Sequence, residues 1–256
     1  MFDLTGRTAL VTGSARGIGA AVARCLGEAG AAVAVNYVSE RSKESAEQVA
    51  SEIRARGGKA IVLRGDVARE DDVQAMIAEV DKAFGRLDIL CNNAGINSNF
   101  TIDTLTLAEW QRIQDVNITG CFLCSKHALP VMRRNGYGRV ILISSMVGEQ
   151  GALFGQLHYA ATKGAQLAFA KTLARTVATE GITVNCIAPG VHMTETLNEI
   201  LVASDPNRMD ATVERIPMGK IGTCEDIGYA AVYLASEEAG YLTGATIDVN
   251  GGMLMR

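Results

Sequence analysis

The stretch TALVTGSARGIGAAVA, residues 8–23, decides the fold of this 256-residue chain. A short apolar run ends at Thr12, a glycine-rich turn follows, and an alanine-rich helix is expected to begin on Gly19. The free N–H groups and the positive dipole end of such a helix attract anions, and the glycines let a phosphate approach the backbone. The spacing is G-x-x-x-G-x-G rather than G-x-G-x-x-G, but a strand before the loop and a helix behind it are the context of a dinucleotide site. The expected cofactor contacts in this loop are Gly13, Ser14, Arg16, Gly17, Ile18 and Gly19.

Similar apolar runs, rich in β-branched residues, alternate with segments of helical period along the whole chain. This alternation predicts repeated βαβ units, and we expect an α/β, single-domain Rossmann fold over residues 1–256 with a doubly wound, seven-stranded parallel sheet. Capping residues at Thr106 and Thr223, and the pair Gly57-Gly58, predict helix ends. The interval 190–222 is too long for a simple connection, and we expect a substrate-binding loop or lid there. The predicted strands are 8–12, 32–37, 60–64, 87–91, 139–144, 183–188 and 246–249.

The composition restricts the function. The chain has 24 basic and 28 acidic side chains and a net charge of -4, so it lacks the basic stripe that nucleic-acid binding requires. It has no run of about 18 apolar residues, and its first residues include an acid where a secretion signal would place bases, so we expect a cytoplasmic protein with no membrane segment. The six cysteines stand in apolar segments and indicate reduced core residues. Cys121 and Cys124 form a single C-x-x-C with no histidine at ligand spacing, so no metal site is expected.

The end of the second strand bears on which dinucleotide binds. A carboxylate at this place accepts hydrogen bonds from the adenosine ribose of NAD, but here Asn36 is neutral. A neutral side chain removes repulsion against a 2′-phosphate, which Arg16 in the first loop is placed to bind. Further donors just beyond the strand are Ser39, Arg41 and Ser42. We therefore expect NADP(H) as the preferred cofactor, with NAD(H) as the alternative.

A tyrosine and a lysine four residues apart form a second candidate site. Tyr159 and Lys163 lie on one face of the helix expected after the fifth strand, and Ser145 lies at the carboxyl end of that strand, where parallel sheets bind ligands. A free phenol is too weak an acid to exchange protons readily at neutral pH, but a nearby ammonium and a cationic nicotinamide favour the phenolate. Tyr159 is then able to exchange a proton with an alcohol or ketone oxygen that Ser145 holds by a hydrogen bond. Asn117 stands in the middle of a predicted helix, where a packing or solvent-facing role is the alternative to a place in this site.

These motifs, in this order and over essentially the whole chain, resemble the short-chain dehydrogenase/reductase family. The matching segments are the glycine loop 12–19, Asn-Asn-Ala-Gly at 92–95, the set Asn117, Ser145, Tyr159 and Lys163, and Pro189-Gly190 after the sixth strand. The resemblance implies that Tyr159 is the proton donor or acceptor and that Lys163 favours its phenolate and holds the nicotinamide ribose. It also implies that Asn117 supports a water relay to the lysine.

The resemblance implies further cofactor contacts. Asp66 and Val67 are expected to flank the adenine, and His192 and Thr194 to approach the nicotinamide carboxamide. The remaining implied contacts are Asn93, Ala94, Gly95, Tyr159, Lys163, Pro189 and Gly190. His192 departs from the family, where an aliphatic residue is more usual, so a role of its imidazole in substrate binding is an alternative to a purely backbone role. The interval from Ser145 to Tyr159 is one residue longer than in many bacterial members, which alters the shape of the pocket.

Within the family the chain is similar to 3-oxoacyl-carrier-protein reductases and to bacterial glucose and other sugar dehydrogenases. The expected substrate is therefore a carrier-bound 3-oxoacyl thioester or a small polyol, sugar or ketone. An acidic acyl carrier protein docks on basic residues, and although Glu180 stands where carrier-dependent members tend to be basic, Arg133, Arg134 and Arg139 are a candidate docking patch. This branch consists mostly of tetramers, and we expect a homotetramer built through the final strand and the helix at 224–235, with a dimer as the alternative.

Two classes of function follow from the sequence. The first is reversible hydride transfer between NADP(H) or NAD(H) and a secondary alcohol or ketone, with Tyr159 as the acid/base. The second is a catalytically idle dinucleotide-binding sensor or scaffold that kept the fold. The intact set of Asn117, Ser145, Tyr159 and Lys163 favours the enzyme, because a sensor has no need of all four. A phosphotransfer domain is excluded because no Lys-Ser/Thr pair follows the glycines.

Overall fold

One parallel sheet organises the molecule. The computed structural model describes residues 2–195, 197 and 207–256. Within them the strands are β1 Thr8–Val11, β2 Ala32–Tyr37, β3 Ala60–Arg64, β4 Ile89–Asn92, β5 Gly138–Ile143, β6 Ile182–Pro189 and β7 Thr246–Val249. Their order is β3-β2-β1-β4-β5-β6-β7, and every pairing is parallel. The predicted fold class is confirmed. Strands β2 and β3 are added on one side of β1, and strands β4 to β7 are added on its other side. The ligand crevice of such a sheet lies at the carboxyl ends of β1 and β4, where the direction changes.

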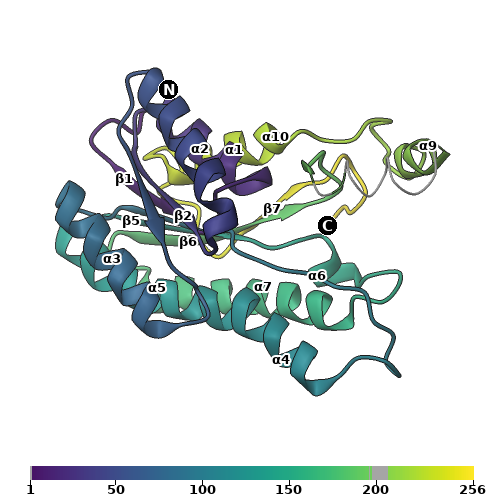
Figure 1. Cartoon of the computed structure of the whole chain (residues 1–256). Helices are drawn as coiled ribbons and strands as arrows, with labels where there is room; N and C mark the ends of the chain where they lie inside the picture. Colours follow the sequence, from purple (N-terminus) through teal and green to yellow (C-terminus); the bar gives the residue numbers. More distant parts are fainter. Residues whose placement is uncertain (1, 196, 198–206) are drawn as a thin grey trace.

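Helices cover both faces of this sheet. The helices are α1 Gly17–Glu28, α2 Lys43–Ala55, α3 Glu70–Phe84, α4 Leu107–Gln114, α5 Gly120–Asn135, α6 Val147–Gln150, α7 Leu157–Val177, α9 Asn207–Val213 and α10 Cys224–Ala235, with a 3-10 turn η1 at Glu40–Ser42 and a π turn η2 at Asp115–Thr119. Helices α1, α2 and α10 lie on one face, and α3, α5 and α7 lie on the other, with α4 beside α7 (Figure 1). Successive side chains of a strand point to opposite faces of the sheet, which explains the two helix layers. In β1, Ala9 and Val11 pack toward the layer of α1, α2 and α10, while Leu10 packs toward the layer of α3, α5 and α7.

The predicted helix ends are confirmed. Before α4 the Glu109 N–H donates to Thr106 Oγ1 at 3.2 Å, and before α10 the Thr223 N–H donates to the carboxylate of Asp226 at 2.7 Å. Gly57, with φ of +85°, follows the end of α2. The Glu109 carboxylate does not return to the start of its helix, and it binds side chains near the active site instead.

The long segment after β6 is described in part. Residues 196 and 198–206, which belong to the predicted loop at 190–222, lie outside the described residues. The two ends of this segment pair with each other, because the Met193 N–H donates to the Gly222 carbonyl at 2.8 Å and the Gly222 N–H donates to the Val191 carbonyl at 3.1 Å. All six cysteines are buried and unpaired, as expected of core residues. Among the described helices we find none long and apolar enough to span a bilayer.

Candidate active site

The loops at the carboxyl ends of the strands are joined in pairs. Thr12 Oγ1 accepts the Asn93 N–H at 3.0 Å, and the Asn93 amide donates to the carbonyls of Thr12 and Gly13 at 2.9 and 3.0 Å. On the other side of the crevice, the Met146 N–H donates to the Pro189 carbonyl at 3.1 Å. The loops after β1 and β4, and those after β5 and β6, therefore line the edge at which a parallel sheet binds its ligand.

The glycines of the first loop leave room for a phosphate. Gly13 and Gly17 have φ of +61° and +55°, a conformation that side chains disfavour. A Cβ on Gly19 would lie 2.4 Å from Nδ2 of Asn93 and 2.5 Å from the Gly13 carbonyl oxygen. The Arg16 side chain does not cap α1, and the first N–H groups of a helix have no acceptor within the helix. The open start of α1 thus fits the pyrophosphate of a dinucleotide.

Ser14 and Asn36 support this loop from inside the protein. Ser14 Oγ donates to the Val11 carbonyl at 2.7 Å and accepts the Asn36 N–H at 2.9 Å. Asn36 Oδ1 accepts the Gly13 N–H at 2.8 Å, and Nδ2 donates to three carbonyls, of which that of Gly65 is nearest at 3.0 Å. Asn36 is only 2% exposed. The predicted contact between this side chain and the cofactor is therefore wrong, because both ends of the amide are bound inside the protein.

The other residues expected at the adenosine end differ in how far their side chains are exposed. Arg16 and Arg41 are exposed. The Asp66 carboxylate accepts the N–H of Ala68 at 3.0 Å. Val67 is buried, and a Cβ on the first residue of α5 would lie 2.7 Å from its Cγ2. The Val67 side chain is therefore packed inside the protein, whereas the two arginines present their side chains.

Helix α7 carries Tyr159 and Lys163 one turn apart. Lys163 Nζ lies 5.4 Å from the centroid of the Tyr159 ring. The ammonium donates to the Ile143 carbonyl at the end of β5 at 2.7 Å and to Gln166 Oε1 at 3.3 Å. Lys163 is 3% exposed and Tyr159 is half-buried, so the sheet edge holds a positive charge beside the phenol.

The two serines at the end of β5 have different surroundings. Ser144 is buried, and its hydroxyl donates to the Lys163 carbonyl at 2.9 Å. Ser145 is half-buried, and its Oγ accepts the Val147 N–H at 3.4 Å. Within the described residues the Ser145 hydroxyl proton has no acceptor, so it is available to a ligand. This difference agrees with the sequence-based choice of Ser145.

Asn117 lies in the π turn η2, where the helix widens between α4 and α5. It is fully buried, and its Oδ1 accepts the Ile96 N–H at 2.8 Å while its Nδ2 donates to the Ile96 carbonyl at 3.0 Å and to Thr162 Oγ1 at 3.1 Å. The solvent-facing alternative is thereby excluded. Asn117 joins the loop after β4 to the helix that carries Tyr159, and a π turn is a frequent feature of functional sites.

Two residues of this site were not predicted from the sequence. Gln166 is fully buried, and its amide donates to the Asn117 carbonyl at 2.8 Å while its oxygen accepts from Lys163. Thr162 donates to the Tyr159 carbonyl at 2.8 Å. The available signal was helical spacing, because Gln166 follows Lys163 by three residues and lies on the same face of α7. Gln166 thus connects the Asn117 backbone carbonyl to the Lys163 ammonium, and the water relay that the family resemblance implied stays a prediction.

The loop after β6 approaches the glycine loop. A Cβ on Gly17 would lie 3.6 Å from Thr194 Cγ2, so Thr194 borders the phosphate site. His192 is 6% exposed and packs against Gly222, on which a Cβ would lie 2.8 Å from the imidazole Nε2. Burial lowers the pKa of His192. The alternative in which this imidazole contacts the substrate is therefore wrong, because the ring points into the protein. Gly190 meets Asn250, whose Cα would lie 2.8 Å from a Cβ at residue 190.

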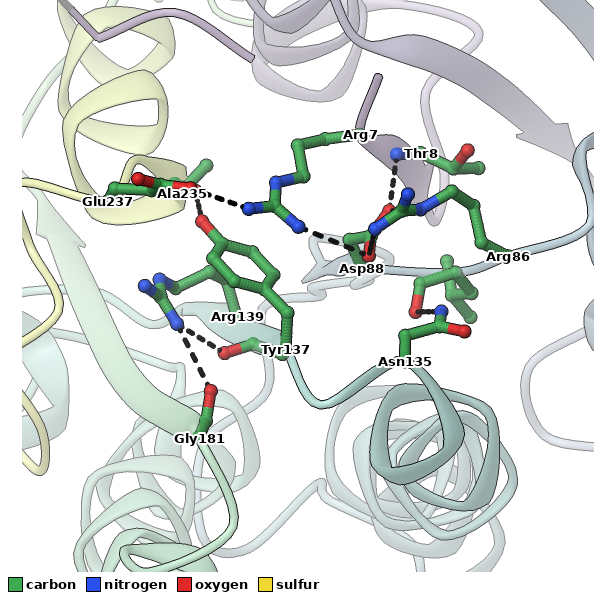
Figure 2. A network of polar contacts seen from close by, with 12 residues as sticks. Arg7, Thr8, Arg86, Asp88, Asn135, Tyr137, Arg139, Gly181, Ala235 and Glu237 are labelled. Carbon is green, nitrogen blue, oxygen red and sulfur yellow. Dashed lines mark hydrogen bonds and ion pairs between the residues drawn. The ribbon is translucent and has the colours of Figure 1, made fainter. Parts of the chain in front are cut away.

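The arginines expected to form a docking patch do not form one. Arg133 pairs with Glu180 at 2.8 Å, and Arg134 pairs with Asp81 at 2.5 Å. Arg139 is 5% exposed, with its guanidinium 4.0 Å from the centroid of the Tyr137 ring, and its donors bind backbone carbonyls (Figure 2). The polar contacts around Arg139 lie at the amino ends of β1, β4 and β5, at the edge of the sheet opposite the candidate site. The Arg139 guanidinium is buried, and Arg133 and Arg134 are paired with carboxylates. These three arginines therefore form no basic surface.

Comparison with known proteins agrees with this geometry. A family model described as enoyl-(acyl carrier protein) reductase matches residues 13–254. The chain is 42% identical over 252 residues to a 3-oxoacyl-[acyl-carrier-protein] reductase FabG of Staphylococcus aureus, covering 97% of this chain and 98% of the relative. It is 39% identical over 259 residues to the 3-oxoacyl-[acyl-carrier-protein] reductase of Synechocystis sp., with 100% of both chains covered. Glucose 1-dehydrogenase 2 of Bacillus subtilis is 39% identical over 254 residues, covering 99% of this chain and 96% of the relative. The chain therefore belongs to the short-chain dehydrogenase/reductase family and is an NAD(P)(H)-dependent oxidoreductase that interconverts a secondary alcohol and a ketone.

Proposed function

We propose that the chain reduces 3-oxoacyl thioesters with NADPH. The supporting observation is the apolar surface of the segment that connects Ser145 to Tyr159, where Leu153 and Phe154 are 75% and 85% exposed. The Phe100 N–H donates to the Gly155 carbonyl at 2.7 Å, which places the loop after β4 against this segment. Apolar surface beside the catalytic residues suits an acyl chain better than a polyhydroxylated sugar.

The catalytic roles follow from the surroundings of each group. When bound, a nicotinamide dinucleotide would supply the hydride chemistry at the ketone carbon, and the glycine loop 13–19 would hold its pyrophosphate. Tyr159 gives its phenolic proton to the ketone oxygen as the alcohol forms. Ser145 donates a hydrogen bond to the same oxygen and so orients the carbonyl. Lys163, held by Ile143 and Gln166, favours the negative charge that develops on the Tyr159 oxygen.

The preference for NADPH rests on two exposed arginines. Arg16 stands at the start of α1 and Arg41 in the turn after β2, and guanidinium groups bind phosphate oxygens in a bidentate manner. Replacing both by alanine is expected to weaken NADPH binding by about tenfold or more while leaving NADH binding nearly unchanged, because each charge-assisted hydrogen bond contributes about 1.5–3 kcal/mol. Fluorescence titration of both reduced cofactors measures this, and equal losses for the two would reject the preference.

The names of the relatives make an acyl carrier protein the candidate partner. The arginines considered for docking are buried or paired, so the acyl group is expected to provide most of the recognition. A coenzyme A thioester should then be reduced with a kcat/KM within about tenfold of the carrier-bound thioester. A much larger advantage of the carrier would show a docking surface elsewhere.

The central test is an assay of Tyr159→Phe beside the parent chain. With acetoacetyl and longer 3-oxoacyl thioesters, kcat is expected to fall by about 10²–10⁴ while the dissociation constant for NADPH stays nearly the same. Tyr241→Phe, an exposed tyrosine between α10 and β7, is the matched control. Full turnover by Tyr159→Phe would reject its catalytic role.

Two other outcomes separate the alternatives. Faster turnover of glucose or polyols with NADP⁺ than of any thioester would favour the second candidate function, a sugar dehydrogenase, which the 39% identity to glucose 1-dehydrogenase 2 supports. Cofactor binding without turnover of any compound would leave the idle sensor, which the names of the relatives do not support.

We also propose that the chain acts as one domain, with residues 190–222 as a substrate lid, and forms a homotetramer in the cytoplasm. The edge strand β7 is half-buried, and Tyr229 of α10 is 63% exposed, so both elements offer surface to a second copy. Light scattering should give about four times the chain mass of 27.1 kDa. A value near twice that mass would instead support the dimer.

A further inference from the structure

Three linked side chains next to Tyr159 have no part in the mechanism above. His158 Nε2 lies 2.8 Å from Ser98 Oγ, and Ser98 Oγ lies 2.5 Å from Glu109 Oε1. The three residues come from α7, from the loop after β4 and from α4. His158 is fully buried although it directly precedes the half-buried Tyr159.

The direction of these hydrogen bonds is fixed by what each group is able to donate. Arg112 binds both oxygens of Glu109 at 2.8 Å, and this pair together with the Ser98 hydroxyl lowers the pKa of Glu109 to about 2. The carboxylate therefore only accepts, and the single Ser98 hydroxyl proton goes to it. Ser98 Oγ then accepts a hydrogen bond from His158, which must carry its hydrogen on Nε2.

The other ring nitrogen supports a neutral imidazole. His158 Nδ1 is buried and has no hydrogen-bond partner within the described residues. A second proton on this nitrogen would lack an acceptor, and burial lowers the pKa of His158. Of the charged groups that face the ring, Glu109 favours the protonated form and Arg112 opposes it.

The histidine secures one segment, residues 96–100, which we call the strap. The strap continues directly from the candidate cofactor residues 93–95 and is anchored at three points. Ile96 is bound by Asn117, and the Phe100 N–H donates to the Gly155 carbonyl. Ser98 lies between them and is bound to α7 through His158 and to α4 through Glu109. The Phe100 ring also meets the imidazole edge-on, with 6.3 Å between centroids.

We propose that His158 is a positioning residue that, through Ser98, holds the strap against the first turn of α7 and thereby sets the substrate side of the pocket relative to Tyr159. This inference rests on the proposed function. His158 has no exposed surface, so it acts through the strap and not on the reacting atoms. Small displacements of a substrate from its reactive geometry slow the reaction strongly, so loss of this anchor should affect chemistry more than folding.

The test compares His158→Leu with His158→Gln. Leucine removes the donor to Ser98 but also removes the unpartnered Nδ1, so the urea midpoint should change little. The kcat/KM for a 3-oxoacyl thioester should fall by about tenfold, while the dissociation constant for NADPH stays within about twofold, because the strap lies beyond the cofactor loop. Glutamine restores an N–H donor near the position of Nε2 and should recover most of the activity.

Two comparisons separate positioning from a general structural effect. Ser98→Ala combined with His158→Leu should lose no more activity than Ser98→Ala alone, since the change at Ser98 already breaks the link to His158. His127→Leu is the matched control. His127 lies on α5, and its Nε2 is 2.8 Å from an oxygen of Glu70 on α3, far from the strap. The control should leave kcat/KM unchanged.

Hydrogen exchange gives a readout that does not depend on turnover. Amides of the strap should exchange faster in His158→Leu than in the parent chain, and at the parent rate in His127→Leu. Parent-like kinetics and exchange in His158→Leu, or an equal loss with glutamine, would overturn the inference. If the parent chain reduces no ketone, the proposed function fails, and the exchange rates still decide whether His158 holds the strap.

Discussion

The substitution Asn36→Asp separates what the sequence suggests from what the structure shows. The sequence pattern alone predicts that a carboxylate at the end of β2 accepts hydrogen bonds from the NAD ribose and shifts the cofactor preference toward NADH. In the structure the Asn36 amide faces three carbonyl oxygens at 3.0–3.4 Å, and only its Oδ1 meets a donor, the Gly13 N–H. A carboxylate here would point an anionic oxygen at those carbonyls, so we expect loss of stability and no change of cofactor preference.

The magnitude follows from the cost of keeping the new carboxyl protonated. Each pKa unit corresponds to about 1.4 kcal/mol, and an ordinary aspartate has a pKa of about 3.9, so a neutral carboxyl costs about 4 kcal/mol at pH 7. The folded-state pKa of this group would lie above its unfolded value, so the folded state gains protons relative to the unfolded state. The deficit should therefore shrink by about 1.4 kcal/mol per pH unit as the pH falls from 7 toward 5. Near pH 4 about 1–2 kcal/mol should remain, because a hydroxyl replaces only part of the lost hydrogen bonding.

The assay is urea unfolding of the parent chain and the variant at several pH values, together with NADPH and NADH titrations. Asn99→Asp, the same chemical change at an exposed position, is the control and should cost little at any pH. If Asn36→Asp unfolds at the parent urea concentration at pH 7 and now prefers NADH, the side chain faces the cofactor and our reasoning is refuted.

Two further predictions concern the sheet ends. Ser145→Ala should lower kcat by about 10²-fold with unchanged stability. Ser144→Ala should lower the free energy of unfolding in urea by about 1 kcal/mol, because it loses the bond to the Lys163 carbonyl, and should lower kcat less. A larger loss of kcat in Ser144→Ala than in Ser145→Ala would exchange the roles of the two serines. Asp88→Asn should destabilise the chain by about 2–3 kcal/mol, because the fully buried Asp88 carboxylate accepts two bonds from Arg86 at 2.7 and 2.8 Å (Figure 2). Since this network lies at the end of the sheet opposite Ser145, kcat of the folded variant should stay unchanged, and a drop in kcat without loss of stability would contradict this account.

Much of the site was accessible from local sequence because its groups are ordered by the strands themselves. In a parallel sheet every carboxyl end lies at one edge, so Ser145 and the glycine loop were certain to meet once the strands were assigned. Helical spacing likewise placed Tyr159 and Lys163 on one face. Inside the site, however, the sequence did not reveal that Gln166 connects Asn117 to Lys163, because that contact depends on how two helices pack.

The succession of strands and helices along the chain, the fold class and the residues that follow each strand were predictable from the sequence, since these depend on periodicity and on glycine conformation. The direction in which each polar side chain points depends instead on tertiary contacts. Asn36 turns inward to satisfy the glycine loop, and Arg139 is buried among carbonyls, although they were expected to face the cofactor and a partner. His192 packs against Gly222, although contact of its imidazole with the substrate was one of two alternatives. The physical reason is that a buried polar group takes whatever partners the surrounding elements supply, and those partners come from distant parts of the chain.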